Sequence, residues 1–435
     1  MPLFRRKRPE PVAPEPEPLC LPVEPPEPDA DGRRSLADHR DFVLELVQPL
    51  LPFGVALLDA VGLQVAEAIR SDVDLPGFDN SAMDGYAVRA HDIRTASPDK
   101  PVTLPVDGVV AAGDVSGALP KGTARKIMTG APVPAGADTV VPYEQTDRGE
   151  EQVAITVPLL AGQNVRYRGS DITDGDLLVE AGTTLGVRHV GLLAAAGVDK
   201  VLVRPRPRVV VIATGSELVE PGTDLAEGEL YDSNSYMVAA AAKAAGAQVW
   251  RVGHVGDDPG AVRDLIVDQL IRADLIVTTG GVSEGDYDVV KEAVPRLGPC
   301  DFTKVAMQPG KPQGVGLIGD DEVPIIMLPG NPVSSYVSFE AFVRPAIRKL
   351  MGATPYVRQA VEATATTGIA SRAGILQLAR GRVETTEQGR MVTPSGSHSS
   401  HLVGELAKAN ALLLLEPETE FLAAGDQVKV WLLDE

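Results

Sequence analysis

Strand-like and helix-like segments alternate between residues 208 and 351, and this alternation constrains the fold most strongly. The run 208–213 is continuous and rich in β-branched residues, which is typical of a strand buried on both faces of a parallel sheet. Further strands are expected at 248–252, 274–279 and 324–328, and helices at 233–246, 259–271, 288–297 and 333–351. The pattern predicts a doubly wound α/β domain over residues 206–352.

The flanking regions have different patterns and predict a multidomain α/β and β protein. Residues 1–34 hold 10 of the 36 prolines, which predicts a disordered Pro/Glu-rich arm. Helical patterns at 36–47 and from Ala60 onward favour a discontinuous helical and linker domain of residues 35–78 and 171–205. Short runs separated by Gly and Pro predict an inserted β domain at 79–170. Similar runs predict a C-terminal β domain at 353–435, either a barrel or a sandwich.

Composition narrows the possible partners and the compartment. With 60 acidic and 40 basic residues the net charge is −20, which argues against general nucleic-acid binding because phosphate contacts need clustered cations. No apolar run approaches the length of a membrane span, so no membrane insertion is expected. The N-terminus has no hydrophobic region of a secretory signal, and only Cys20 and Cys300 are present. A cytoplasmic protein without disulfides is expected.

Three predicted strands end in polar, glycine-rich loops at 214–217, 279–288 and 329–335. The carboxyl ends of parallel strands meet at one edge of a sheet, where ligands of doubly wound folds bind. Glycine lets backbone N–H groups approach an anion, and the following helix N-termini add partial positive charge. Any one loop could be ordinary turn chemistry. The three together favour a ligand crevice.

Carboxylates lie in or beside these loops, at Glu217, Asp257 and Asp288. They would repel an anionic ligand unless a Mg²⁺ ion lay between them. Helix N-capping explains Asp257 equally well. Lys304, Lys311 and Arg168 could hold an anion locally, although a solvated surface charge is the ordinary reading of any single cation.

Three more segments, at 79–86, 127–134 and 162–171, combine polar side chains with loop-forming residues. Each could be a structural turn or part of a site.

Taken together, these segments resemble the MoeA family of molybdopterin molybdenumtransferases, which includes the C-terminal part of gephyrin. The motifs that carry the resemblance span residues 76–86, 127–134, 215–218, 231–234, 280–283, 309–312 and 328–334. It covers the chain from about residue 35 to the C-terminus. The resemblance implies an elongated homodimer of four-domain chains. It also implies a reaction that inserts molybdate into adenylated molybdopterin and releases AMP, with Mg²⁺.

The resemblance also implies site residues. Those expected to be catalytic are Asp84, Thr129, Asp171, Glu217, Asp257 and Asp288, with Glu217 and Asp288 holding Mg²⁺ against the pyrophosphate. Asp84 or Asp257 would orient water or act as a base. Residues expected to bind substrate are Arg168, Ser216, Gly280, Gly281, Ser283, Lys304, Lys311, Pro329, Asn331, Pro332 and Ser334. In the family, the dimer brings the region of Asp84 and Thr129 against the α/β domain of the partner chain.

The sequence departs from the family pattern at two places. Gln308 replaces a lysine found in many members, and Glu284 and Asp286 add negative charge beside an anionic substrate. These departures leave a second function open, a gephyrin-like scaffold or anchor with weak or no transferase activity and a peptide partner. A nucleotide-dependent kinase is disfavoured because no Walker-type Gly-Lys-Ser/Thr loop is present.

Overall fold

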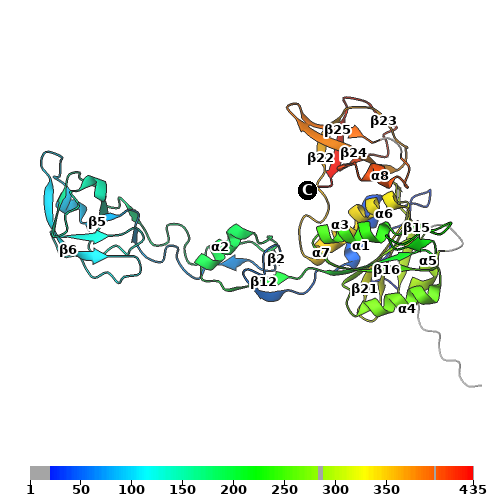
Figure 1. Cartoon of the computed structure of the whole chain (residues 1–435), viewed down its shortest axis with the longest axis horizontal. Helices are drawn as coiled ribbons and strands as arrows, with labels where there is room; N and C mark the ends of the chain where they lie inside the picture. Colours follow the sequence, from blue (N-terminus) through cyan, green and yellow to red (C-terminus); the bar gives the residue numbers. More distant parts are fainter. Residues whose placement is uncertain (1–19, 283–287, 396–397, 435) are drawn as a thin grey trace, which may run out of the picture. The chain divides into compact units, whose positions relative to one another are not determined.

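The computed structural model describes residues 20–282, 288–395 and 398–434. The chain divides into two compact units, one of residues 53–203 and one of the segments before and after it (Figure 1). Among the helices of the described residues, none combines the length and apolar character needed to span a membrane.

A six-stranded sheet forms the centre of the α/β domain. Its order is β16 (Gln248–Val255), β13 (Arg208–Thr214), β17 (Leu275–Thr279), β21 (Val323–Leu328), β20 (Pro312–Ile318) and β18 (Cys300–Lys304). The first four strands are parallel, which confirms the doubly wound prediction, and the last two are antiparallel. The antiparallel pair was not predicted. Glycine is required at Gly314 and Gly316 of β20, because a Cβ atom there would lie 2.8 Å from Phe302 and 2.7 Å from Cys300 respectively. These two glycines interrupt the pattern of β-forming residues by which a strand is recognised in the sequence.

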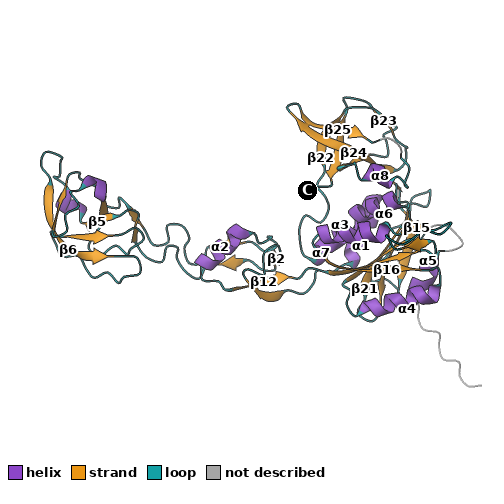
Figure 2. Cartoon of the chain, in the orientation of Figure 1, coloured by secondary structure: helices purple, strands orange, loops and turns teal. Residues whose placement is uncertain are grey.

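Helices cover both faces of this sheet (Figure 2). On one face lie α1 (Leu36–Leu46), α3 (Asn234–Ala244) and α7 (Arg344–Leu350), and on the other lie α4 (Pro259–Leu270) and α5 (Val289–Ala293). Val209 and Val211 of β13 join the first core, whereas Val210 and Ile212 join the second. Alternate side chains of a strand point to opposite faces, so the continuous apolar run is what a doubly covered strand requires.

The C-terminal domain is a closed barrel, which decides between the two predicted alternatives. Five strands form it, in the order β24 (Leu376–Thr386), β25 (Gly389–Pro394), β22 (Val361–Ala365), β28 (Gln427–Leu432) and β26 (Ala411–Leu415), and pairing of β26 with β24 closes the ring. The short β19 (Met307–Gln308) of the α/β domain pairs with the start of β24. A mixed core that includes Val333, Phe342, Leu412 and Trp431 continues across this junction, and Val333 lies in α6 (Pro332–Ser338).

The other unit contains the inserted β domain. Its sheet has the order β8 (Thr139–Pro142), β5 (Gly85–Val88), β7 (Ala124–Ile127), β6 (Val102–Val110) and β9 (Gln152–Ile155). Tyr86, Ile127 and Ile155 are fully buried within it. A Cβ atom at Gly85 would lie 2.0 Å from the carbonyl oxygen of Val141, so only glycine allows β5 to pair this closely with β8.

The predicted discontinuous domain is corrected in two respects. The expected helix from Ala60 is absent, and two short strands follow instead. Strand β2 (Gln64–Val65) pairs with β12 (Lys200–Arg204), and β3 (Ile69–Arg70) pairs with β11 (Leu177–Val179). Beside these strands and β1 (Phe53–Ala56) lies the helix α2 (Val187–Ala195). Helix α1 belongs to the α/β domain, because its apolar face packs against that core. Tertiary packing therefore overrode the local helical pattern.

Residues 20–34 of the predicted disordered arm, residues 1–34, are ordered, and the remainder lies outside the described residues. Within the described part, Leu21 and Val23 pack against the α/β core. Arg34 is buried and forms a bidentate ion pair with Asp301, and its N–H donates to the carbonyl of Lys304 at 2.9 Å. These apolar and charged contacts offset the entropy of ordering a proline-rich segment.

His39 of α1 is buried against the edge of Phe342, and this burial predicts an acid-sensitive fold. Burial, and secondarily the charge of Arg34, lowers its pKa from 6.5 to about 4. The folded state therefore resists a proton that the unfolded chain accepts, so stability is lost as pH falls from 6.5 towards 4, by about 3 kcal/mol from this group. Urea unfolding of the wild type and of His39→Gln across this range measures it. An equal pH slope in both proteins would contradict the assignment.

Candidate functional site

The three glycine-rich loops of the α/β sheet converge on one cavity of about 770 Å³. Seven of the predicted site residues line it: Glu217, Asp257, Gly280, Gly281, Asp288, Asn331 and Pro332. The crevice predicted from the strand order is therefore present at the carboxyl edge of the sheet. Ser283, Glu284 and Asp286 lie outside the described residues.

Glycine is required where the second loop passes the end of β13. Gly280 has φ +95°, and a Cβ atom there would lie 2.6 Å from the carbonyl oxygen of Thr214. Gly281 has φ +67°, and its Cβ would lie 2.8 Å from Cγ2 of Val290. Any side chain at these positions would clash with β13 or α5, so the backbone could not keep this path.

Glu217 presents its carboxylate at the cavity wall. The side chain folds back over Gly215, where a Cβ atom would lie 2.6 Å from Glu217 Oε2. Within the described part of the chain, the Glu217 carboxylate has no hydrogen bond or ion pair, and the residue is exposed. An exposed carboxylate with spare lone pairs beside a cavity can accept a metal ion or a ligand donor.

Asp257 connects the first loop to the end of β16. Its Oδ2 accepts from the Ser216 N–H at 2.9 Å, and its own N–H donates to Ser216 Oγ at 2.9 Å. The capping alternative is wrong for this residue, because Asp258 caps α4 by accepting from the Ala261 N–H at 2.7 Å. Asp257 and Ser216 therefore hold the first loop against the end of β16.

Asp288 has a cationic neighbour. Its carboxylate lies 3.2 Å from Lys291 Nζ. Across the described residues, no group of three or more His, Cys, Asp or Glu side chains is arranged to hold a metal. Mg²⁺ usually takes one or two carboxylates and completes its shell with water and substrate phosphate, so two carboxylates in one cavity fit such an ion.

A second cavity of about 690 Å³ shares Gly330 and Asn331 with the first. Lys311, Pro329 and Ser334 line it, as do Gln308, Arg33 and Arg372. Two arginines thus line the same cavity as Gln308. Lys304 instead lines a third cavity of about 590 Å³, together with Lys311.

In the other unit, the three polar loop segments come together. The Ser81 N–H donates to the Ala131 carbonyl at 3.0 Å, and the Ala82 N–H donates to the Asn164 carbonyl at 2.9 Å. These bonds fix the loop that carries Asp84. Asp84 Oδ1 accepts from both the N–H of Thr129, at 2.7 Å, and its hydroxyl, at 2.8 Å.

The Asp84–Thr129 pair gives a prediction. The N–H and, next, the hydroxyl of Thr129 hold the pKa of Asp84 below its usual range, because both bonds favour the carboxylate. In Thr129→Val the hydroxyl bond is lost and the N–H bond remains, so the pKa of Asp84 rises part of the way to its ordinary value. Carboxyl carbon NMR titration measures it, with Thr129→Ser as the control that keeps the low pKa. An unchanged pKa in Thr129→Val would show that the hydroxyl has no effect.

Arg168 and Asp171 differ in their surroundings. The Arg168 guanidinium forms an ion pair with Asp74, so an anion would compete with Asp74 for this cation. The backbone N–H of Arg168 donates to Asp79 Oδ1 at 2.8 Å. The Asp171 N–H donates to the Leu75 carbonyl at 3.0 Å, while its exposed carboxylate has no hydrogen bond among the described residues.

Three family models together match most of the chain. The MoeA N-terminal region (domains I and II) matches residues 34–197, a probable molybdopterin-binding domain matches 210–349, and the MoeA C-terminal region (domain IV) matches 362–433. A molybdopterin molybdenumtransferase 2 of Mycobacterium tuberculosis is 43% identical over 408 residues, which cover 92% of this chain and 99% of that protein. The chain belongs to the MoeA family.

Other MoeA-family members agree with this assignment. A molybdopterin molybdenumtransferase of Staphylococcus epidermidis is 35% identical over 87% of this chain and 91% of its own length. A crystal structure of the MoeA protein from Pyrococcus horikoshii matches with a TM-score of 0.81 and 31% identity over 92% of this chain and 99% of that one. Membership makes this chain a transferase of molybdenum cofactor biosynthesis.

Sequence reasoning missed several residues of this MoeA-family site. Asn234, Thr279 and His401 line the first cavity, and Arg372 lines the second. Asn234 Nδ2 donates to the Gly330 carbonyl at 2.6 Å and so fixes the third loop. The position of Asn234 in the motif 231–234 could have marked it. Arg372 and His401 come from the C-terminal domain, and no local pattern connects them with the α/β loops.

Proposed function

We propose that this transferase inserts molybdate into adenylated molybdopterin and releases AMP, with Mg²⁺ as the cofactor. The observation that carries the proposal is the pair of adjoining cavities. The first is lined by carboxylates and backbone, and the second by lysine and arginine side chains. Two such environments suit two anionic substrates of different character, one approached through a divalent ion and one through direct cationic contacts.

The adenylated pterin would place its pyrophosphate in the first cavity. Glu217 and Asp288 would hold Mg²⁺, which supplies neutralisation of the phosphate charge. Gly280 and Gly281 leave room for the phosphate beside the sheet, and the Ser216–Asp257 pair keeps the loop of Glu217 in place. Asp257 would also orient water at this end of the cavity.

Molybdate, a tetrahedral dianion, would bind in the second cavity. Lys311 and Arg372 provide positive charge, Ser334 provides a hydroxyl donor, and Pro329 shapes the wall. Gly330 and Asn331 border both cavities, so the molybdate and the pterin would meet at these residues. Lys304 lines the third cavity together with Lys311 and would add positive charge on the molybdate side.

Measurement of AMP release tests this function. Purified protein supplied with adenylated molybdopterin, Mg²⁺ and molybdate is expected to release AMP at a rate that saturates with molybdate. Removal of Mg²⁺ by a chelator is expected to stop release. Substrate binding without any AMP release would contradict the proposal. It would favour the scaffold alternative, in which the protein binds a peptide partner and has weak or no transferase activity. We expect the reaction to take place in the cytoplasm.

We further propose a homodimer in which Asp84, Thr129, Arg168 and Asp171 of one chain serve the cavity of its partner. The exposed Asp84 carboxylate supports it, because its low pKa keeps it ionised at neutral pH, where it can accept a hydrogen bond from water or help to hold a cation. Mixing the inactive variants Asp84→Ala and Glu217→Ala after unfolding and refolding is expected to restore roughly one quarter of the sites, since random pairing makes half of the dimers mixed and each mixed dimer has one intact site. No recovery would contradict the shared site.

A further inference from the structure

The wall of the first cavity that carries Glu217 has little regular structure to hold it. Between β13 and α3 the chain forms only the two-residue strands β14 (Leu218–Val219) and β15 (Leu230–Tyr231), paired in parallel. The residues between these strands, 220–229, are mostly exposed. Yet this segment contributes Glu217, Leu218 and 230–234 to the cavity lining. Some other contact must fix its position.

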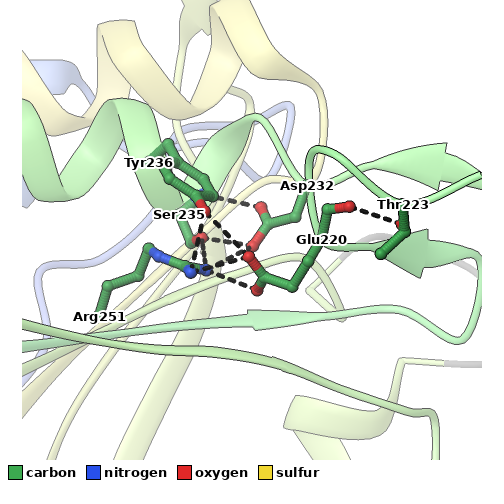
Figure 3. Close-up of polar contacts among 6 residues, drawn as sticks. All are labelled: Glu220, Thr223, Asp232, Ser235, Tyr236 and Arg251. Carbon is green, nitrogen blue, oxygen red and sulfur yellow. Dashed lines mark hydrogen bonds and ion pairs between the residues drawn. The ribbon is translucent and has the colours of Figure 1, made fainter.

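A charged cluster binds both ends of the segment to the sheet and to helix α3 (Figure 3). The Arg251 guanidinium, from β16, donates through Nη1 and Nη2 to the two oxygens of Glu220, both at 2.8 Å. The same guanidinium lies 3.6 Å from Asp232 Oδ2. Glu220 directly follows β14 and Asp232 directly follows β15. One side chain thus contacts the segment on either side of its exposed part.

Helix α3 completes the Arg251 cluster, which we define as Glu220, Asp232, Ser235, Tyr236 and Arg251. Asp232 accepts from the N–H of Ser235 at 3.0 Å and from its hydroxyl. The Tyr236 hydroxyl donates to Glu220 Oε2 at 2.9 Å, and the guanidinium lies 4.0 Å from the centre of the Tyr236 ring. Every charged group in the cluster therefore has several partners.

The geometry makes this cluster stronger than an ordinary surface ion pair. The Arg251 side chain is 24% exposed and the Asp232 side chain is 0% exposed. Bidentate Arg–carboxylate contacts in partly shielded positions are among the strong hydrogen bonds of proteins, and a ring stacked on the guanidinium restricts its motion further. Removal of Arg251 would leave the buried Asp232 charge without its cation beside the cavity.

We propose that Arg251 is a positioning residue that fixes the segment 217–232, and with it the Glu217 carboxylate, at the wall of the first cavity. Arg251 does not itself line the cavity, so it acts through Glu220 and Asp232. The expected effect of Arg251 on Mg²⁺ binding rests on the function proposed above for Glu217. The expected effect on the local stability of residues 217–232 does not depend on that function.

Amide hydrogen exchange of the ligand-free protein is the first test. In Arg251→Met the amides of 217–232 are expected to exchange about tenfold faster, because their local opening becomes easier. Arg208→Met is the matched control. Arg208 donates to Asp274 at 2.7 Å at the start of β13, the strand next to β16, so its loss removes a similar pair that contacts no residue of 217–232. Equal exchange of 217–232 in wild type and Arg251→Met would overturn the proposal.

Steady-state kinetics of AMP release is the second test. Arg251→Met is expected to raise the half-saturating Mg²⁺ concentration about tenfold and to leave the half-saturating molybdate concentration unchanged, since Glu217 borders only the first cavity. Arg251→Lys is expected to restore Mg²⁺ saturation only in part, because an ammonium lacks the planar fork. A fall in the rate of AMP release with unchanged half-saturating concentrations of both Mg²⁺ and molybdate would indicate a merely structural role and overturn the proposal.

Glu220→Gln keeps the test decisive if Arg251→Met folds poorly. This variant removes the charge of one partner and retains a similar shape, and faster exchange confined to 217–232 is again expected. Unchanged exchange in this variant would count against the proposal. A wild-type protein that releases no AMP would refute the proposed function alone, and the exchange results would still decide the role of Arg251.

Discussion

Glu217→Ala is expected to lower AMP release at least about 100-fold, the usual cost of removing a group that stabilises charge developing in a transition state. The carboxylate lines the first cavity and makes no hydrogen bond or ion pair within the described residues, so it has no structural partner to lose. The fold should therefore survive the change. AMP release under saturating Mg²⁺ and molybdate measures the effect.

Glu227→Ala is the matched control for Glu217→Ala. Glu227 lies exposed on the same segment and does not line the cavity, so its removal changes the net charge equally without touching the site. Full activity is expected for this variant. A Glu217→Ala protein with wild-type activity would refute the assigned role, whereas equal losses in both variants would indicate a general electrostatic effect.

Glu340→Ala is expected to destabilise the protein by about 3–5 kcal/mol, because removing one partner of a buried ion pair leaves the other charge uncompensated. The Glu340 side chain is 3% exposed and accepts from Arg358 Nε at 2.6 Å. Arg358 in turn donates to the carbonyls of Leu432 and Leu433 at 2.7 and 3.0 Å. Glu340 therefore anchors the end of the C-terminal barrel to a helix of the α/β domain.

A second arginine makes the loss of Glu340 more costly. Arg344 lies 3.9 Å from Glu340, and burial, followed by the charge of Arg358, lowers the Arg344 pKa to about 10. Without Glu340 these two cations would repel each other in a half-buried space.

Urea unfolding measures the effect of Glu340→Ala. Glu292→Ala is the control, since its 3.6 Å pair with Arg296 is 62% exposed on the glutamate side and is worth less than about 1 kcal/mol. A loss below about 1 kcal/mol in Glu340→Ala would contradict the structural role of this pair.

Local patterns were sufficient for the parallel part of the sheet and its helices. The segment 208–213 is β13 with one residue added, and the helices expected at 233–246 and 259–271 are α3 and α4 within two residues at each end. These elements obey a simple period because both faces of the sheet are covered. Strand β20 shows no such alternation of apolar residues, because glycine is required at Gly314 and Gly316, where Phe302 and Cys300 pack closely against the backbone.

The site divides in the same way. Gly280, Gly281 and Glu217 were predictable because a buried strand followed by glycine and polar residues indicates the ligand edge of a doubly wound sheet. The partners of these residues were not. The Lys291 contact of Asp288, the Asp74 contact of Arg168 and the roles of Arg251 and Arg372 depend on segments brought together from distant parts of the sequence.

The sequence alone determined the parallel strands and the helices of the α/β domain, the location of the ligand loops and the family, because each depends on residue types at short spacing. The tertiary structure alone decided that residues 20–34 and α1 join the α/β core, that the C-terminal strands close a barrel, and that two cavities of different charge adjoin at Gly330 and Asn331. The physical reason is that burial and ion pairing depend on contacts between residues far apart in the chain, and these contacts outweigh local propensity wherever the two disagree.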